Sequence, residues 1–327
     1  MRVRTHPHPF SPIAAFPFWT EPPRVWGPES ADAGTWVPPP ARPADPALLK
    51  DNPSPGNIAA LHRGGSWNGM SLSTEPKTSA EPLPPHSPLT TYYDDDAKRS
   101  RYVVDLFNRT ARHYNTIEAL FLNGGLLYRR FSLRRAGLRR GMKVLDVAIG
   151  TAAVARGAAK IVGHEGQVFG VDPSTGMLGE AKRVFHGPLT RGVAEKLPFA
   201  DNSFDFVTMG IALRHVSDLV VTFREYLRAL KPGGTLWILE GHIPRSRLGH
   251  QLTRFVWARV VPGMTLLSTG SRDAKLLMDY YWDTVEQCVP PETIVRAMNE
   301  VGFEGVKYRV VVPGAFCEYT GRKARLA

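Results

Sequence analysis

The chain has 327 residues, of which 43% are hydrophobic and 22% are charged, and its formal net charge is +11. These values are typical of a globular protein with one or two domains, and the sequence contains no run of about 18 apolar residues that could cross a membrane. The two cysteines, Cys288 and Cys317, exclude a disulfide framework, and no Cys/His cluster has zinc spacing. We therefore expect a protein without a metal in a reducing, cytoplasmic setting. Within this setting, peripheral contact with the inner membrane surface is the alternative to a location free in the cytoplasm.

The first 90 residues differ in composition from the rest of the chain. They hold nineteen of the 28 prolines, and their seven Lys/Arg balance seven Asp/Glu. Such a segment buries too little apolar surface to offset its ordering entropy, so we expect residues 1–90 to be a disordered extension and residues 91–327 to form the domain. Met70 opens a polar leader, and we hypothesise that residues 1–69 are absent from the natural protein.

The positive charge is concentrated in one short segment. The stretch "YRRFSLRRAGLRRG", residues 128–141, carries six arginines. A basic surface favours nucleic acid, anionic lipid or an anionic ligand. Two interpretations of residues 129–140 stay open: a solvated helix end, or a surface that docks on a membrane or a substrate.

Helix-like and strand-like segments alternate along the domain. Residues 101–137 predict two helices, broken at Asn123-Gly124-Gly125. Strands are then expected within 143–148, 166–172, 189–195, 204–213 and 234–241, with helices between them, which favours a parallel sheet covered on both faces. Residues 243–290 interrupt this rhythm and predict a helical cover. A helix from the prolines at 290–291 and two late strands, the last one antiparallel, complete the domain.

Two acids mark the ends of the first two predicted strands. Asp146 precedes a short loop, "AIGTA", and Asp172 follows 26 residues later (172 − 146). In open parallel sheets, ligands bind beyond the carboxyl ends of the strands, and an acid at the end of the second strand can accept hydrogen bonds from ribose hydroxyls. A dinucleotide dehydrogenase would have glycines directly after the first strand, where Asp146 stands.

Four phrases carry a resemblance to a known family. They are "VLDVAIGT", "AEKLPFADNSFDFVT", "GIALRHVSD" and "LRALKPGGTLWILE". In this order and spacing the chain resembles the class I S-adenosylmethionine (SAM) methyltransferases, and within them the ubiquinone/menaquinone biosynthesis C-methyltransferases, from about Phe107 to Phe316. The resemblance implies an α/β fold: a doubly wound, mostly parallel seven-stranded sheet of the Rossmann-like kind, with N-terminal helices and a helical cover.

The resemblance also implies binding roles for SAM, the expected cofactor. The residues concerned are Asp146, Gly150 and Thr151 for the methionine part, Asp172 for the ribose, Val193 and Ala194 for the adenine, and Gly210 for the floor near the sulfonium. The loop departs from the family, because Ile149 stands where a second glycine is frequent and Ala152 where a third one is. A glycine there often permits a positive φ, which costs alanine roughly 1 kcal/mol, so a weakened but working loop is expected.

The same resemblance points to the catalytic residues. Arg214 and His215 of "LRHV" are expected at the mouth of the site, and Tyr114 of "RHYN" over it. Arginine is a poor base, so Arg214 would hold a phenolate or orient water. His215 replaces the usual asparagine of the family, and its intrinsic pKa of about 6.5 suits a base. Packing or a simple hydrogen bond remains the alternative for His215 and Tyr114.

The expected activity is C-methylation of a prenylated quinol, a lipophilic small molecule. The alternatives are methylation of another phenolic or lipid-like small molecule, including O-methylation, and a non-catalytic SAM-fold protein that binds partners. No nucleic acid is expected, since the Asn/Asp-Pro-Pro-aromatic phrase of amine methylation is absent where "TMGIALRHV" stands. The oligomeric state stays open.

Overall fold

The computed structural model describes residues 82–93, 95–122 and 125–325. The predicted disorder of residues 1–81 and the Met70 hypothesis lie outside the described residues. Residues 82–90, however, belong to the domain: Leu89 is buried, and the Leu83 carbonyl accepts a hydrogen bond from the backbone of Leu219. The folded part therefore begins before the predicted boundary at residue 90, because this proline-rich stretch contains apolar side chains that the core accepts.

Two helices open the domain, as predicted. Helix α1 spans Asp96–Leu122 and α2 spans Gly125–Ala136. Helix α1 packs on α4 (Thr175–Val184), α7 (Val261–Thr269) and α8 (Arg272–Glu286), and α2 packs on α3 (Ala153–Val162) and β5 (Leu230–Gly241). Helix α1 thereby connects α4, which follows β2 of the sheet, to the cover.

The sheet has seven strands in the order β3-β2-β1-β4-β5-β7-β6. Their bounds are β1 Lys143–Val147, β2 Gln167–Asp172, β3 Leu189–Arg191, β4 Phe204–Gly210, β5 Leu230–Gly241, β6 Phe303–Val312 and β7 Phe316–Lys323. Strands β1 to β5 are parallel, and β7 is antiparallel to both β5 and β6. The prediction of a mostly parallel, doubly wound sheet with a late antiparallel strand is confirmed.

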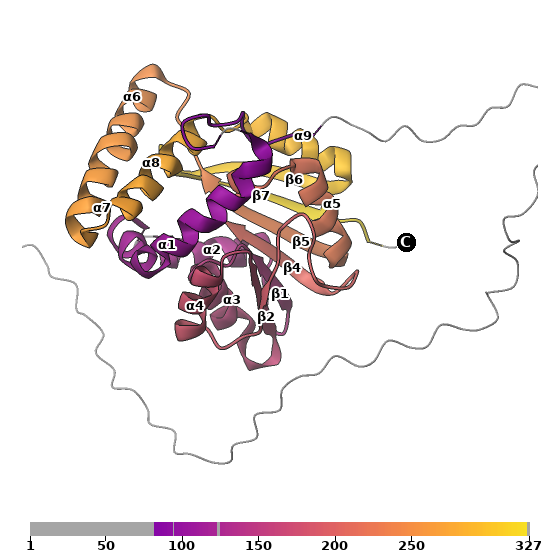
Figure 1. The fold of residues 1–327 in the computed structure, drawn as a ribbon. Helices are drawn as coiled ribbons and strands as arrows, with labels where there is room; N and C mark the ends of the chain where they lie inside the picture. The colour runs from indigo at the N-terminus through magenta and orange to yellow at the C-terminus, as the bar shows by residue number, and fades with distance from the viewer. Residues whose placement is uncertain (1–81, 94, 123–124, 326–327) are drawn as a thin grey trace, which may run out of the picture. The chain divides into compact units, whose positions relative to one another are not determined.

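Helices cover both faces of this sheet (Figure 1). They are α3 Ala153–Val162, α4 Thr175–Val184, α5 Leu219–Ala229 and α9 Pro291–Val301. Alternate residues of β1 feed two hydrophobic cores: Val144 belongs to the core with α3, and Leu145 to the core with α5 and α9. This alternation is the two-sided burial expected of a central parallel strand.

The predicted cover is helical. It consists of α6 Arg247–Phe255, a π-helical turn Val256–Val260, α7 Val261–Thr269 and α8 Arg272–Glu286. Figure 1 shows α6 and α7 at one end of the domain, outside α8. Helix α8 packs on both α1 and α7, so it joins the cover to the rest of the fold.

The site is fixed by the topology. Strand β1 pairs with β2 on one side and with β4 on the other, in parallel register. After β1 the chain passes to β2 on one side of it and later to β4 on the other side. The switch point of the sheet therefore lies between β1 and β4. Ligands bind in such a crevice, beyond the carboxyl ends of the strands.

Candidate functional site

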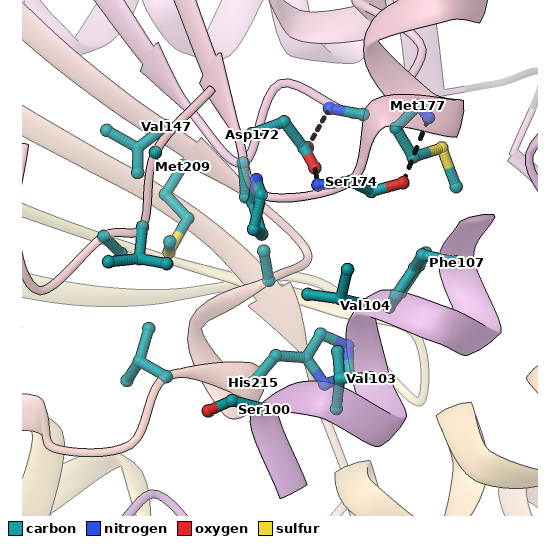
Figure 2. A pocket seen from close by; sticks show the side chains of 18 of the residues that line it. Ser100, Val103, Val104, Phe107, Val147, Asp172, Ser174, Met177, Met209 and His215 are labelled. Atoms are coloured by element: carbon teal, nitrogen blue, oxygen red, sulfur yellow. Dashed lines mark hydrogen bonds between the residues drawn. The ribbon is translucent and has the colours of Figure 1, made fainter. Parts of the chain in front are cut away.

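A pocket lies at this switch point. It encloses about 870 Å³ of space, part of it open to solvent, and its lining comes from the ends of β1, β2 and β4 and from α1. Figure 2 shows Asp172 and Ser174 on one side of it, with His215 and Phe107 on the opposite side.

Asp172 ends β2 and lines the pocket. Its Oδ2 accepts a hydrogen bond from the Gly150 backbone N–H (2.9 Å), and its Oδ1 accepts one from the Ser174 N–H (2.8 Å). Burial raises the pKa of Asp172 to about 6, against the opposite effect of these two bonds. The carboxylate thus joins the loop after β1 to the start of α4, where Ser174 caps the helix by accepting from the Met177 N–H.

Asp146 and Thr151 lie behind the pocket and not on its lining. Asp146 Oδ1 accepts a hydrogen bond from Thr208 Oγ1 (2.7 Å), whereas Asp146 Oδ2 has no hydrogen-bond partner in the described part of the chain. Burial raises the pKa of Asp146 to about 7. The Thr151 hydroxyl donates to Glu118 Oε2 of α1 (3.4 Å). We expected both side chains to face the methionine part of SAM. In the structure neither side chain is exposed to the pocket.

In the loop after β1, every second residue from 148 to 152 lies in the left-handed region. The φ angles are 53° at Ala148, 55° at Gly150 and 66° at Ala152. At Ala152, the residue directly before α3, a glycine with a positive φ is frequent in the family, and the alanine has this conformation here; Ala148 has it as well. Two alanines in the left-handed region cost roughly 1 kcal/mol each, so the loop is strained but complete.

Ile149, the other departure from the family, has a packing partner. Its side chain is buried, and a Cβ atom added at Gly170 of β2 would lie 2.2 Å from Ile149 Cδ1. The absent side chain of Gly170 thus provides the space that Ile149 fills. The isoleucine stabilises the loop from below, where a glycine would leave a cavity.

We expect Ala148→Gly to raise the free energy of unfolding by about 0.5 kcal/mol. The substitution removes strain of about 1–2 kcal/mol and adds about 0.4–1 kcal/mol of unfolded-state entropy. The matched control is Gly150→Ala, which should lower stability because it introduces the same strain at φ 55°. Urea unfolding measures both, and a destabilised Ala148→Gly variant would contradict the strain argument.

The adenine side of the predicted site is also brought to the pocket. Val193 and Ala194 line it, together with Glu195. Glu195 Oε1 accepts from both the backbone N–H (2.6 Å) and the hydroxyl (2.7 Å) of Ser217. These two hydrogen bonds connect the segment after β3 to the segment after β4. They therefore stabilise the two sides of the pocket against one another.

Gly210, at the end of β4, forms part of the floor as expected. A Cβ atom there would lie 2.8 Å from Val154 Cγ2 of α3. The missing side chain lets β4 approach the helix that follows the loop. A larger residue would push the loop and the floor apart.

His215 lines the pocket, and its ring forms no hydrogen bond with a described residue. Its ring stacks on Tyr280 (centroids 5.5 Å apart, 14° between planes) and meets the edge of Phe107. Both ring nitrogens are buried without a partner among the described residues. Burial, followed by the positive charges of Arg214 and Arg99, holds the pKa of His215 well below 6.5. The ring is therefore neutral at pH 7, with one donor and one acceptor left for a ligand.

Arg214 does not line the pocket, so its expected place at the mouth is corrected. Its guanidinium forms a buried ion pair with Glu240 (2.6 Å), donates to Thr284 Oγ1 (3.0 Å) and lies over the Tyr281 ring. It also donates to the carbonyl of Ile211 (2.9 Å). A buried guanidinium turns to a carboxylate because an unpaired charge there is costly.

The bond from Arg214 to Ile211 holds a strained residue. Ile211 lines the pocket with a φ of 57°, which is a genuine outlier for a β-branched side chain. Such strain persists only where the surroundings impose it, and it clusters at functional sites. Arg214 thus positions the pocket wall from behind.

Tyr114 lines the pocket, as predicted, and burial raises its pKa to about 12, so it is a donor at neutral pH. Sequence reasoning missed Phe107, Ser174, Met177 and Ile211. For Phe107, the signal in the sequence was the polar residue beside it, Asn108. In the structure, Asn108 Oδ1 accepts hydrogen bonds from Ser174 Oγ (2.7 Å) and from the Gly176 N–H (2.9 Å). This asparagine fixes α1 to α4 across the pocket.

The arginine-rich segment 129–140 is used in part within the fold. Arg129 pairs with Glu118, Arg135 with Glu318, and Arg140 with Glu165. Three of the six arginines therefore attach α2 and the residues after it to other elements. The other three are in no ion pair with a described residue, so the pairing occupies half of the segment's charge and both interpretations of the segment stand.

The sequence of this chain is similar to those of known methyltransferases. Residues 95–323 match the model of the ubiE/COQ5 methyltransferase family. A demethylmenaquinone methyltransferase of Staphylococcus saprophyticus is 32% identical over 70% of this chain and 99% of that protein. The ubiquinone/menaquinone biosynthesis C-methyltransferase UbiE of Idiomarina loihiensis is 32% identical over 69% of this chain and 92% of that protein. Among solved structures, phosphoethanolamine N-methyltransferase 2 of Haemonchus contortus with SAM has a TM-score of 0.48 at 21% identity, covering 67% of this chain and 57% of that one.

Proposed function

We propose that this chain, which belongs to the ubiE/COQ5 methyltransferase family and is thus a SAM-dependent methyltransferase, methylates a ring carbon of a prenylated quinol. The observation that carries the proposal is the family match over residues 95–323, since the matched relatives bear the names of quinone-biosynthesis C-methyltransferases. The mostly apolar pocket with a few polar groups is consistent with an aromatic acceptor beside a cofactor.

The residues present fit SAM. A carboxylate has about four lone-pair sites, and Asp172 uses two of them for Gly150 and Ser174, which leaves two for the ribose hydroxyls. The unpartnered Oδ2 of Asp146 supports a role toward a cationic methionine part, because a buried carboxylate oxygen without a partner is costly. Val193, Ala194 and Gly210 would hold the adenine and the reacting end. SAM supplies an electrophilic methyl group.

The acceptor's activation depends on positive charge near His215. Carbon methylation needs a ring hydroxyl to lose its proton, which raises electron density on the neighbouring carbon. Arg214 and Arg99, whose charges lower the pKa of His215, would also lower the pKa of a hydroxyl bound at the same place. A neutral His215 can accept the hydroxyl's hydrogen bond, and a solvent water molecule takes the proton, since the pocket is partly open to solvent. The low pKa favours this hydrogen-bonding role over that of a base with a pKa near 6.5.

We expect His215→Leu to lower kcat by about ten- to a hundredfold, because a hydrogen bond to a group that becomes charged contributes about 1.5–3 kcal/mol. His215→Asn, which keeps a donor and an acceptor, should stay within about tenfold of the wild type. The SAM Kd, measured by calorimetry, should change little in either variant. If the asparagine variant falls as far as the leucine variant, proton transfer to the imidazole is required and the hydrogen-bonding role is wrong.

The proposed reaction is tested with two acceptors. The protein is incubated with isotope-labelled SAM and a prenylated benzoquinol or naphthoquinol that lacks a ring methyl group, and the product is identified by mass spectrometry and NMR. We expect a new carbon-bound methyl group on at least one of them. Transfer to oxygen, or transfer only to other molecules of a lipid extract from the source, would replace the proposal by the alternative phenolic or lipid-like acceptor.

A further inference from the structure

A row of large apolar side chains is exposed along the cover, which we call the apolar stripe. It consists of Leu248, Leu252, Phe255, Val256, Val260, Met264 and Leu267. Leu248 and Leu267 near its two ends are 77% and 87% exposed. Single exposed apolar residues are ordinary, but a continuous row of them marks an interaction surface.

The opposite side of the same helices is already packed. Trp257 donates from its indole nitrogen to the carbonyl of Gly314 (3.0 Å) and lies on the Tyr281 ring at 5.1 Å. Thr253 and Thr265 are buried on this inner side. The apolar stripe is therefore the outward face of an anchored element, and no rotation of the helices could bury it without exposing the inner face.

The π-helical turn keeps the apolar stripe on one side. In an uninterrupted α-helix each residue turns by about 100°, so Met264 would lie about 160° away from Leu248 and about 120° away from Leu252. The turn Val256–Val260, in which the Val261 N–H bonds the Val256 carbonyl, contains one additional residue. This insertion rotates the following helix back by about one residue, which aligns the two halves of the stripe.

The segment that carries the apolar stripe has charges of one sign, whereas acidic residues of α8 and α9 lie beside it. Residues 241–271 contain four arginines and no aspartate or glutamate. Arg245 and Arg254 pair with Glu292 and Glu286, whereas Arg247 and Arg259 are in no ion pair with a described residue. An outward apolar row flanked by arginines is the pattern of an element that lies in the interface of an anionic bilayer.

We propose that the apolar stripe on α6, the π turn and α7 docks this protein on an anionic lipid bilayer. No helix among the described residues is long and apolar enough to span a membrane, so contact through this surface would be peripheral. The inference rests on the proposed function in one respect: a prenylated acceptor resides in the bilayer and must be reached from its surface. It places the docking surface on the cover and not on residues 129–140.

The position of the stripe relative to the pocket supports this assignment. A surface depression lies between the π turn, α1 and α8, and its lining includes Arg259, Tyr92 and Tyr102. Both tyrosines contact Tyr280, at 5.1 and 5.7 Å between ring centroids, and Tyr280 stacks on His215 of the pocket. A chain of aromatic contacts thus runs from the docking surface to the proposed acceptor site.

The test is sedimentation of the full chain with phosphatidylcholine vesicles, with and without phosphatidylglycerol. We expect Leu252→Glu combined with Leu267→Glu to weaken binding at least tenfold. The matched control is Phe131→Glu, a charge placed on an apolar residue of α2 that is as exposed as Leu252 (both 63%), and it should bind like the wild type. Replacing Arg247 and Arg259 by glutamine should weaken binding to anionic vesicles about fivefold per residue and leave neutral vesicles unaffected.

Several outcomes would overturn the inference. They are unchanged binding of the doubly substituted variant, loss of binding in Phe131→Glu, and a wild-type dimer without vesicle affinity that Leu252→Glu converts to monomer. Vesicle binding is scored without any acceptor, and calorimetric SAM affinity confirms that each variant is folded. A protein that binds vesicles but methylates no quinol would refute the proposed function alone, whereas methylation of a water-soluble short-chain quinol without vesicle binding would refute the docking surface alone.

Discussion

Replacing Arg214 by alanine is expected to lower the free energy of unfolding by about 3–5 kcal/mol. The reason is Glu240, whose buried carboxylate would lose the guanidinium that pairs with it at 2.6 Å. Removing one member of a buried pair leaves an uncompensated charge, and the loss is of this size in proteins generally. Urea unfolding at pH 7 measures it. An unchanged midpoint would show that Glu240 finds another partner.

The double variant Arg214→Leu with Glu240→Leu is the control. Apolar residues of similar volume can replace a buried ion pair with little loss, so this variant should regain most of the stability. Its turnover should nevertheless stay low, because the carbonyl of the strained Ile211 loses the hydrogen bond that positions the pocket wall. Full recovery of both stability and turnover would show that Arg214 only stabilises the fold and does not position the pocket wall. Low turnover in a stable protein would identify it as a positioning residue.

The fold was predictable where the pattern of residues is regular. Alternating strand-like and helix-like segments were enough for the parallel sheet, and the late strand at residues 316–323 was found from its composition. The strand expected at 204–213 ends at Gly210, since Ile211 adopts a positive φ that β-branched residues disfavour. No propensity predicts this conformation, because tertiary contacts impose it. The π turn in the cover was missed for the same reason.

The site was predictable mainly where its residues lie at strand ends, and only in part elsewhere. Asp172 and Gly210 lie where parallel strands end, so their convergence follows from the topology. The orientation of Arg214 does not follow, since it depends on Glu240, which reaches Arg214 only because β4 and β5 pair with Gly210 opposite Leu239. A motif indicates which residue types occur together, but burial and pairing decide which of them face a ligand.

Asp172→Asn is expected to weaken SAM binding by about a hundredfold or more. Hydrogen bonds to a charged group contribute about 1.5–3 kcal/mol each, and the carboxylate has two acceptor sites left for the ribose. The substitution also removes one acceptor from the pair that holds Gly150 and Ser174. Calorimetry gives the Kd, with Asp201→Asn as the control, an exposed carboxylate paired with Arg228. An affinity equal to that of the control would exclude Asp172 from the cofactor site.

The pH dependence separates a binding role of Asp172 from a structural one. Because burial raises its pKa to about 6, wild-type SAM affinity should fall as the pH drops below 6 and the carboxyl group is protonated, while the Asp172→Asn variant shows no such change. Stability without SAM should respond in the opposite direction. The folded state holds this proton more tightly than the unfolded state, so the wild type loses stability as the pH rises from about 4 to 6, and asparagine avoids that loss. If the Asp172 carboxylate serves to bind SAM, the Asp172→Asn variant should bind SAM more weakly. Above pH 6 the same variant should be at least as stable as the wild type.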